Sequence, residues 1–253
     1  AHPIGSWQDE FKVAKKLGLN CIEFILDYND VHNNPLLNHD GIDDIKKIID
    51  ITGVAVGTIC ADYFMEAPLH SKNNKIAEKS QKVLINLLKN VSKLRVTDVV
   101  VPCVEQSSLI DQNDVERFVL NLMPVINFAE TYCINLSLET DLDPRSFFEL
   151  LERFGSKRIT VNYDIGNSAA MGYSLVEELN AYGSRITDIH IKDRKLGAGS
   201  VELGKGDADF EGFFNKLKEF NYKGPFIMQA YRDDEGLRIF KKQLDWVKPY
   251  LNE

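Results

Sequence analysis

The sequence predicts a parallel α/β barrel of the (β/α)8 class, the TIM barrel. Strand-like and helix-like patterns alternate along its 253 residues, without a low-complexity segment or a linker rich in Pro, Gly or Ser. Such alternation is typical of a parallel sheet with helical crossovers. About eight such units in roughly 250 residues is the usual size of this barrel. We therefore expect a single barrel domain over residues 1–253.

Seven segments read as strands because they are short and apolar, several with alternating polar residues. The chain opens on a helical pattern, so we expect the first strand of the barrel to precede Ala1. A doubly wound open sheet is the alternative, but it usually carries a Gly-rich turn after its first strand, and this sequence has none there. The seven segments are 21–28, 54–64, 98–104, 134–140, 159–166, 186–193 and 224–230.

Eight segments have helical periodicity, and some carry end signals. Asp143 followed by Pro144 is a helix start, and Ser174 with Glu177 forms a capping box. Pro124 predicts an interruption of the fourth helix. The eight segments are 6–18, 40–53, 74–94, 114–132, 143–155, 174–183, 209–220 and 234–251.

Composition narrows the class of function. The formal net charge of −8 and the lack of a basic block argue against a nucleic-acid surface. No apolar run approaches the ~20 residues of a membrane span, and no secretion signal opens the chain. We expect a cytoplasmic protein with its thiols reduced and buried. The cysteines are Cys21, Cys60, Cys103 and Cys133.

Polar side chains gather on one face of the later strands. In residues 186–193, Asp188, His190 and Lys192 oppose Ile189 and Ile191. In a barrel the face turned to the helices is apolar and the other looks into the lumen, where C-terminal strand ends form the active site.

Four of these lumen-facing residues are spaced by about one βα unit each: Glu139, Asp164, His190 and Gln229. Two carboxylates, an imidazole and an amide oxygen that meet at one point are ligands for a divalent cation. We therefore expect one divalent metal ion there, namely Mn, Co, Zn or Mg.

Several segments resemble the xylose-isomerase-like TIM barrels, specifically the sugar phosphate isomerase/epimerase branch. The resemblance covers nearly the whole chain and implies that Glu139, Asp164 and His190 are metal ligands. It also shows a departure, because the usual glutamate of the eighth strand is Gln229, which cannot act as a base. The matching segments are GLNCIEFILD, LSLET, VNYDIGNSAAMG, DIHIKDR, ELGKGDADF and GPFIMQAYR.

The resemblance implies a sugar or sugar-phosphate isomerase or epimerase that abstracts a proton next to a carbonyl. Glu139 is the expected base, and Lys192 or Asn167 the expected donor to the developing oxyanion. Glu23 is a candidate for binding substrate hydroxyls. The substrate would be a small sugar or sugar phosphate.

Loop residues add to the expected site. Lys205 follows the seventh barrel strand and Arg232 the eighth, where such barrels often bind phosphate. In the segment 62–75, Tyr63, Phe64 and Met65 are candidates for covering a sugar face. A second acid or base could come from Asp62 or Glu105.

Two other functions stay open at this stage because of Gln229. One is a metal-dependent lyase or dehydratase on the same site. The other is a non-catalytic barrel that has lost the second base. Self-association into a homo-oligomer is also left open.

Overall fold

A computed structural model describes residues 7–231 and 236–251 of the chain. Contacts within the chain group it into two compact units. Unit 1 consists of residues 1–140 and 150–160, and unit 2 of residues 141–149 and 161–253. The expectation of one domain over the whole chain stays a prediction.

The centre of unit 1 is a parallel sheet in the order β1-β2-β3-β4. Its segments form strands because they are rich in β-branched and other apolar residues, which pack on both faces of a parallel sheet. Every residue of β3 is buried. The four strands are β1 (Cys21–Ile25), β2 (Ala55–Cys60), β3 (Asp98–Cys103) and β4 (Asn135–Thr140).

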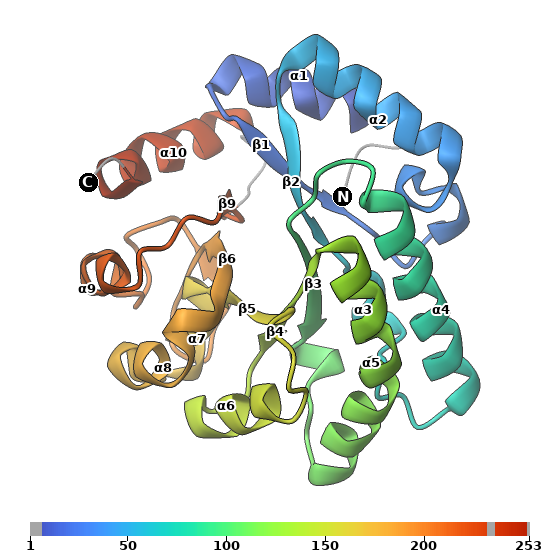
Figure 1. Ribbon diagram of the computed structural model, residues 1–253. Coiled ribbons are helices and arrows are strands. Elements are labelled where there is room, and N and C mark those ends of the chain that lie inside the picture. Colours follow the sequence, from blue (N-terminus) through green and yellow to red (C-terminus); the bar gives the residue numbers. More distant parts are fainter. Residues whose placement is uncertain (1–6, 232–235, 252–253) are drawn as a thin grey trace. The chain divides into compact units, whose positions relative to one another are not determined.

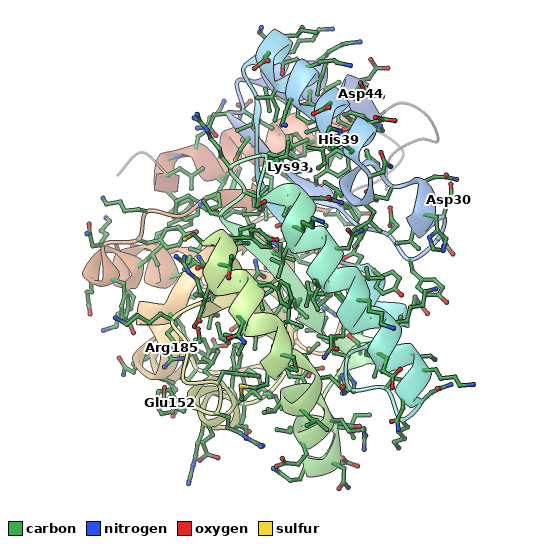
Figure 2. All side chains as sticks on the ribbon, turned by 45° about the vertical axis from the view of Figure 1, so that its right-hand side comes forward. Asp30, His39, Asp44, Lys93, Glu152 and Arg185 are labelled. Atoms are coloured by element: carbon green, nitrogen blue, oxygen red, sulfur yellow. The ribbon has the colours of Figure 1, made fainter. Side chains whose placement is uncertain are left out.

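Helices cover the outer side of this sheet, and α4 and α5 lie next to each other (Figure 1). The helices bury an apolar face, and charged side chains such as Asp44 on α2 and Lys93 in the turn after α4 are exposed (Figure 2). Between β2 and α4 lies the single turn α3 (Tyr63–Glu66). The long helices are α1 (Trp7–Leu17), α2 (His39–Thr52), α4 (Asn74–Val91) and α5 (Gln112–Tyr132).

Unit 2 carries the remaining parallel strands, in the order β5-β6-β9. Beyond β6 the chain forms a small antiparallel ribbon of β7 (Asp193–Arg194) and β8 (Ser200–Val201), which the periodicity does not predict. The strands are β5 (Ile159–Asp164), β6 (Ile186–Ile191) and β9 (Phe226–Met228). The helices are α6 (Pro144–Glu152), α7 (Ile165–Met171), α8 (Leu175–Tyr182), α9 (Phe210–Leu217) and α10 (Leu237–Leu251).

The expected break at Pro124 is wrong, because α5 runs unbroken through this residue. Proline in a helix interior removes one backbone hydrogen bond. Phe118, Leu122 and Val125 on the same helix are fully buried, and this packing outweighs the local cost.

The expectation that all four cysteines are buried needs correction. Cys60 and Cys103 are buried, but Cys21 is half-buried and Cys133 is exposed. Cys133 is the C-cap of α5 and has a positive φ of 55°, where the chain turns at the surface.

None of the helices within residues 7–231 and 236–251 combines the length and the apolar character that crossing a membrane requires.

Unit 2 contains a buried carboxylate, Glu178, held by hydroxyl groups. Tyr163 donates a hydrogen bond of 2.8 Å and Tyr182 one of 3.0 Å, and Ser168 donates a third. Burial raises the pKa of the Glu178 carboxyl, and the three hydroxyl groups oppose this effect. The network ties α8 to β5 and to α7, and so supports the helix that follows Asp164.

We expect the Glu178→Gln variant to gain stability relative to the wild type as pH rises. A carboxyl whose pKa is raised in the folded state contributes most below its unfolded pKa, and this contribution is lost as pH rises through the folded pKa. Glutamine can still accept hydrogen bonds and carries no charge to bury. Thermal melts of both proteins between pH 4.5 and 8 test this. A difference that does not grow with pH would contradict it.

Candidate active site

Asp164 is the last residue of β5 and the N-cap of α7. Its Oδ1 accepts a hydrogen bond of 2.8 Å from the backbone N–H of Asn167, so it is the N-cap of α7. Its side chain is only 1 % exposed. This hydrogen bond holds the carboxylate in one orientation. The neighbouring side chains His190 and Lys192 lie next to its other oxygen, Oδ2.

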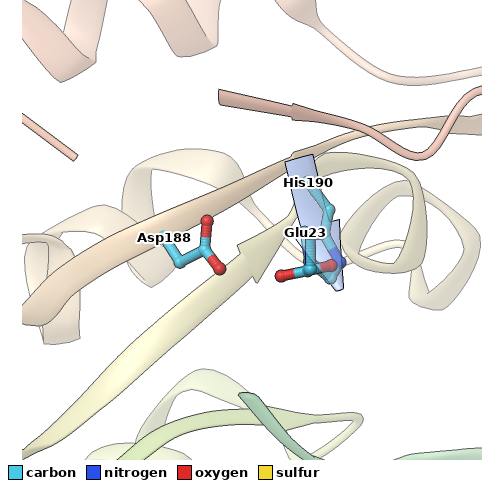
Figure 3. A group of neighbouring side chains, drawn as sticks. All are labelled: Glu23, Asp188 and His190. Carbon is cyan, nitrogen blue, oxygen red and sulfur yellow. The ribbon is translucent and has the colours of Figure 1, made fainter. Parts of the chain in front are cut away.

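His190 lies beside Asp164 on the next strand, since the two are register partners between β5 and β6. The imidazole Nδ1 is 3.9 Å from Asp164 Oδ2, and the His190 side chain is fully buried. Asp188 shares the same face of β6 (Figure 3), and one of its carboxylate oxygens lies within 4.8 Å of a His190 ring nitrogen. Alternation along β6 therefore places these polar side chains together, as the sequence predicts.

Lys192 and Gln229 complete this polar group. The Lys192 ammonium donates to Asp164 Oδ2 at 3.3 Å and to Gln229 Oε1 at 3.0 Å. Gln229 follows β9, and its backbone N–H donates to Ile191 on β6. The amide oxygen that the sequence assigns to a metal thus accepts a hydrogen bond from Lys192.

Gly166 in the first turn of α7 allows Lys192 to come this close. A Cβ atom at Gly166 would lie 2.9 Å from Lys192 Cγ and 3.0 Å from its carbonyl carbon. The first of these is shorter than real Cβ atoms essentially ever show, and the second is tighter than nine in ten real Cβ contacts. Only glycine fits between α7 and the stem of Lys192.

The loop after β6 is organised by a residue that the sequence reasoning misses, Asp193. Its buried carboxylate accepts hydrogen bonds from the backbone N–H groups of Gly204 (2.9 Å), Gly206 (2.8 Å) and Ala208 (3.2 Å). The exposed Lys205 lies inside this stretch. The signal that could have found it is an acid at a strand end followed by two closely spaced glycines, since bare backbone N–H groups favour an anion.

Asn167 is held in the same part of unit 2. Its Oδ1 accepts a hydrogen bond of 2.8 Å from Arg194 Nη1, and Arg194 Nε donates to the carbonyl of Ala198. The loop of residues 194–198 is therefore tied to the start of α7. Arg232, which the sequence assigns to the substrate, lies outside the described residues.

Unit 1 holds the other two predicted acids on its strands. Glu23 on β1 accepts a hydrogen bond of 2.8 Å from Thr58 on β2, its register partner. Glu139 on β4 is 6 % exposed and pairs in register with Pro102 of β3. Glu139 is the last residue but one of β4, at the C-terminal strand end where active sites of parallel barrels form, whereas Glu23 is the central residue of β1.

Cys60 lies among acids of unit 1. Its Sγ donates to Asp62 Oδ1 at 3.1 Å. Burial raises the pKa of the Cys60 thiol well above its usual value, and the carboxylates of Glu23, Asp62 and Glu139 raise it further. Burial also raises the pKa of Asp62, against the effect of the Cys60 hydrogen bond. The thiol therefore stays protonated, and Asp62 takes up a proton more readily than an exposed carboxyl does.

The expected cover of a sugar face by Tyr63 and Phe64 is wrong. They belong to α3 and are 0 % and 1 % exposed, so they are core residues of unit 1. An aromatic pair at a turn after a strand fits a core as well as a lid, and periodicity cannot separate the two. Glu105 is exposed, and Met65 is half-buried.

Comparisons with known proteins show the family to which this chain belongs. A family model described as xylose isomerase-like TIM barrel matches residues 11–250. L-ribulose-5-phosphate 3-epimerase UlaE of Escherichia coli is 24 % identical over 262 residues, which cover 98 % of this chain and 91 % of that protein.

Solved structures show the same fold. The D-psicose 3-epimerase of Clostridium cellulolyticum H10 with D-tagatose superposes with a TM-score of 0.78, at 18 % identity, over 98 % of this chain and 94 % of that one. The IolI protein with a bound zinc atom gives a TM-score of 0.78 at 19 % identity, over 96 % and 94 %. The predicted fold class is confirmed, and the chain belongs to the family of xylose isomerase-like TIM barrels.

Proposed function

We propose that this chain is a divalent-metal-dependent epimerase of a small sugar or sugar phosphate that works by proton abstraction next to a carbonyl. The assignment to the epimerases among the isomerases rests on family membership and on relatives named L-ribulose-5-phosphate 3-epimerase. The observation that carries the chemistry is the buried Asp164–His190 pair with the Lys192 ammonium beside it.

The donor set fits a divalent metal. Asp164 and His190 are buried, and Asp164 Oδ2 and His190 Nδ1 are near enough to share one cation. A carboxylate oxygen and an imidazole nitrogen are ligands that Mn, Co and Zn accept readily. We propose Glu139 as the third ligand, because β4, β5 and β6 are successive strands of a family barrel. When bound, the ion would act as a Lewis acid that polarises the substrate carbonyl and its neighbouring hydroxyl.

Glu139 is the proposed base. Its carboxylate would take the proton from the carbon next to the carbonyl, and the electron pair would move onto the carbonyl oxygen to give an enediolate. Lys192 would donate a hydrogen bond to that oxygen. A proton from water on the opposite face of the enediolate, with the proton on Glu139 released to solvent, would give the epimer.

The remaining predicted residues serve substrate binding in this proposal. Asn167 lies in the first turn of α7, and Glu23 is oriented by Thr58. Lys205 and Arg232 are proposed for a phosphate group on the substrate. The relative named for a phosphorylated ketose favours a phosphate, whereas D-psicose 3-epimerase is named for a free sugar.

A lyase or dehydratase is the second candidate, and the observation that favours it is Gln229. An amide cannot accept a proton, so the second base of a two-base epimerisation is not at this position. Loss of a leaving group from the enediolate needs only one base.

Proton exchange in deuterated water tests the proposal. We expect a metal-depleted protein to be inactive and, with added Mn²⁺, to incorporate deuterium at C3 of L-ribulose 5-phosphate while the C3 epimer forms. D-psicose is the comparison substrate without phosphate. Release of an unsaturated or deoxy product would support the lyase instead. No exchange with any ketose and any of the four metals would contradict both.

A further inference from the structure

One oxygen of Asp164 is shared by two neighbours that carry different chemistry. The Lys192 ammonium lies 3.3 Å from Asp164 Oδ2, and the His190 Nδ1 lies 3.9 Å from the same atom. Asp164 Oδ1 is engaged by the backbone of Asn167. A divalent ion held between Asp164 Oδ2 and His190 would therefore meet the ammonium at the same oxygen.

We propose that Lys192 and the divalent ion compete for Asp164 Oδ2, and that Gln229 holds the ammonium instead of binding the ion. This inference rests on the metal site of the proposed function. In this inference the amide oxygen of Gln229 is a neutral acceptor for the Lys192 ammonium, which donates to it at 3.0 Å. The ion would then have three protein ligands, which leaves coordination positions for two oxygens of a substrate.

Charge explains why glutamine suits this task. A carboxylate at position 229 would attract both the ammonium and a divalent cation, and would bind a hard cation more strongly than an amide does. An amide oxygen accepts a hydrogen bond from the ammonium without adding negative charge. Since like charges at close range repel strongly in a poorly hydrated site, an ammonium against Asp164 weakens the binding of an ion there.

Packing keeps the ammonium in place. The Lys192 side chain is 17 % exposed, so most of its stem is covered. Gly166 leaves room for that stem, because a Cβ atom there would lie 2.9 Å from Lys192 Cγ. The covered stem therefore holds the Lys192 ammonium beside Asp164, and a divalent ion would have to displace this ammonium.

Mn²⁺ affinity of the whole chain, measured by isothermal titration calorimetry, tests the competition. We expect Lys192→Met to bind Mn²⁺ about tenfold more tightly than the wild type, as removal of one charge-assisted contact implies. We expect Gln229→Leu to bind Mn²⁺ at least as tightly as the wild type, because it removes a partner of the ammonium and no ligand. Lys195→Met, which removes an exposed lysine nearby, is the matched control and should change nothing.

The two variants distinguish the outcomes. If Gln229→Leu weakens Mn²⁺ binding tenfold while Lys192→Met leaves it unchanged, Gln229 is a ligand and the inference is overturned, although the metal site stands. If neither wild type nor Lys192→Met binds Mn²⁺, Co²⁺, Zn²⁺ or Mg²⁺, the metal site of the proposed function fails as well. If circular dichroism shows that Lys192→Met does not fold, the Mn²⁺ affinity of Gln229→Leu alone decides whether Gln229 is a ligand.

Discussion

Glu139→Gln is expected to lose epimerase activity by a factor of roughly 10² to 10⁴, the usual contribution of a positioned general base. Glutamine has nearly the same shape as glutamate, so the packing around β4 should survive. Its amide cannot accept the proton that the carboxylate takes. The measurement is the rate of deuterium incorporation at C3 at saturating Mn²⁺, with circular dichroism to verify the fold.

The matched control for this variant is Glu149→Gln. Glu149 is an exposed residue of α6 that pairs with Arg145 at 2.9 Å, and exposed pairs of this kind contribute little. It should retain full activity. If Glu139→Gln kept more than a tenth of the wild-type rate under these conditions, Glu139 would not be the base, and Asp62 would be the next carboxyl of unit 1 to examine.

Asp193→Ala is expected to destabilise the protein by roughly 3–5 kcal/mol, because three backbone N–H groups lose a buried charged acceptor. That is a large part of the total stability of an ordinary protein, about 5–15 kcal/mol. A decrease in the melting temperature of about 10 °C follows for a chain of this size. Thermal unfolding followed by circular dichroism gives both values.

Asp207→Asn is the control from the same loop. Asp207 is exposed and accepts one hydrogen bond, from the backbone of Leu196 at 2.8 Å. We expect its melting temperature to stay within 1–2 °C of the wild type, as surface changes usually do. Limited trypsin digestion adds a local readout, since release of the loop should speed cleavage after Lys205 in Asp193→Ala. Equal melting temperatures for both variants would show that Asp193 does not hold the loop.

The strands and long helices could be predicted from the sequence because their periodicity is strong. The polar face of β6 and the Asp164 cap were also readable, since alternation and strand-end acids are local signals. Asp143 before Pro144 correctly predicted the start of α6, where the Ser146 N–H donates to the Asp143 side chain.

The sequence could not supply what depends on partners distant along the chain. The three backbone bonds of Asp193 come from residues 11 to 15 positions later. The hydrogen bond of Gln229 with Lys192 joins residues 37 positions apart. Pro124 was misjudged for the same reason, because the packing that keeps α5 intact is tertiary.

The narrow gap at Gly166 has a mechanical consequence. The Lys192 side chain packs so near α7 that a Cβ atom at Gly166 would lie 2.9 Å from its Cγ. A tilt of that short helix would therefore shift the Lys192 stem and its ammonium. Glu178, which accepts a hydrogen bond from Ser168 of α7, is a group whose change would reach the ammonium by this route.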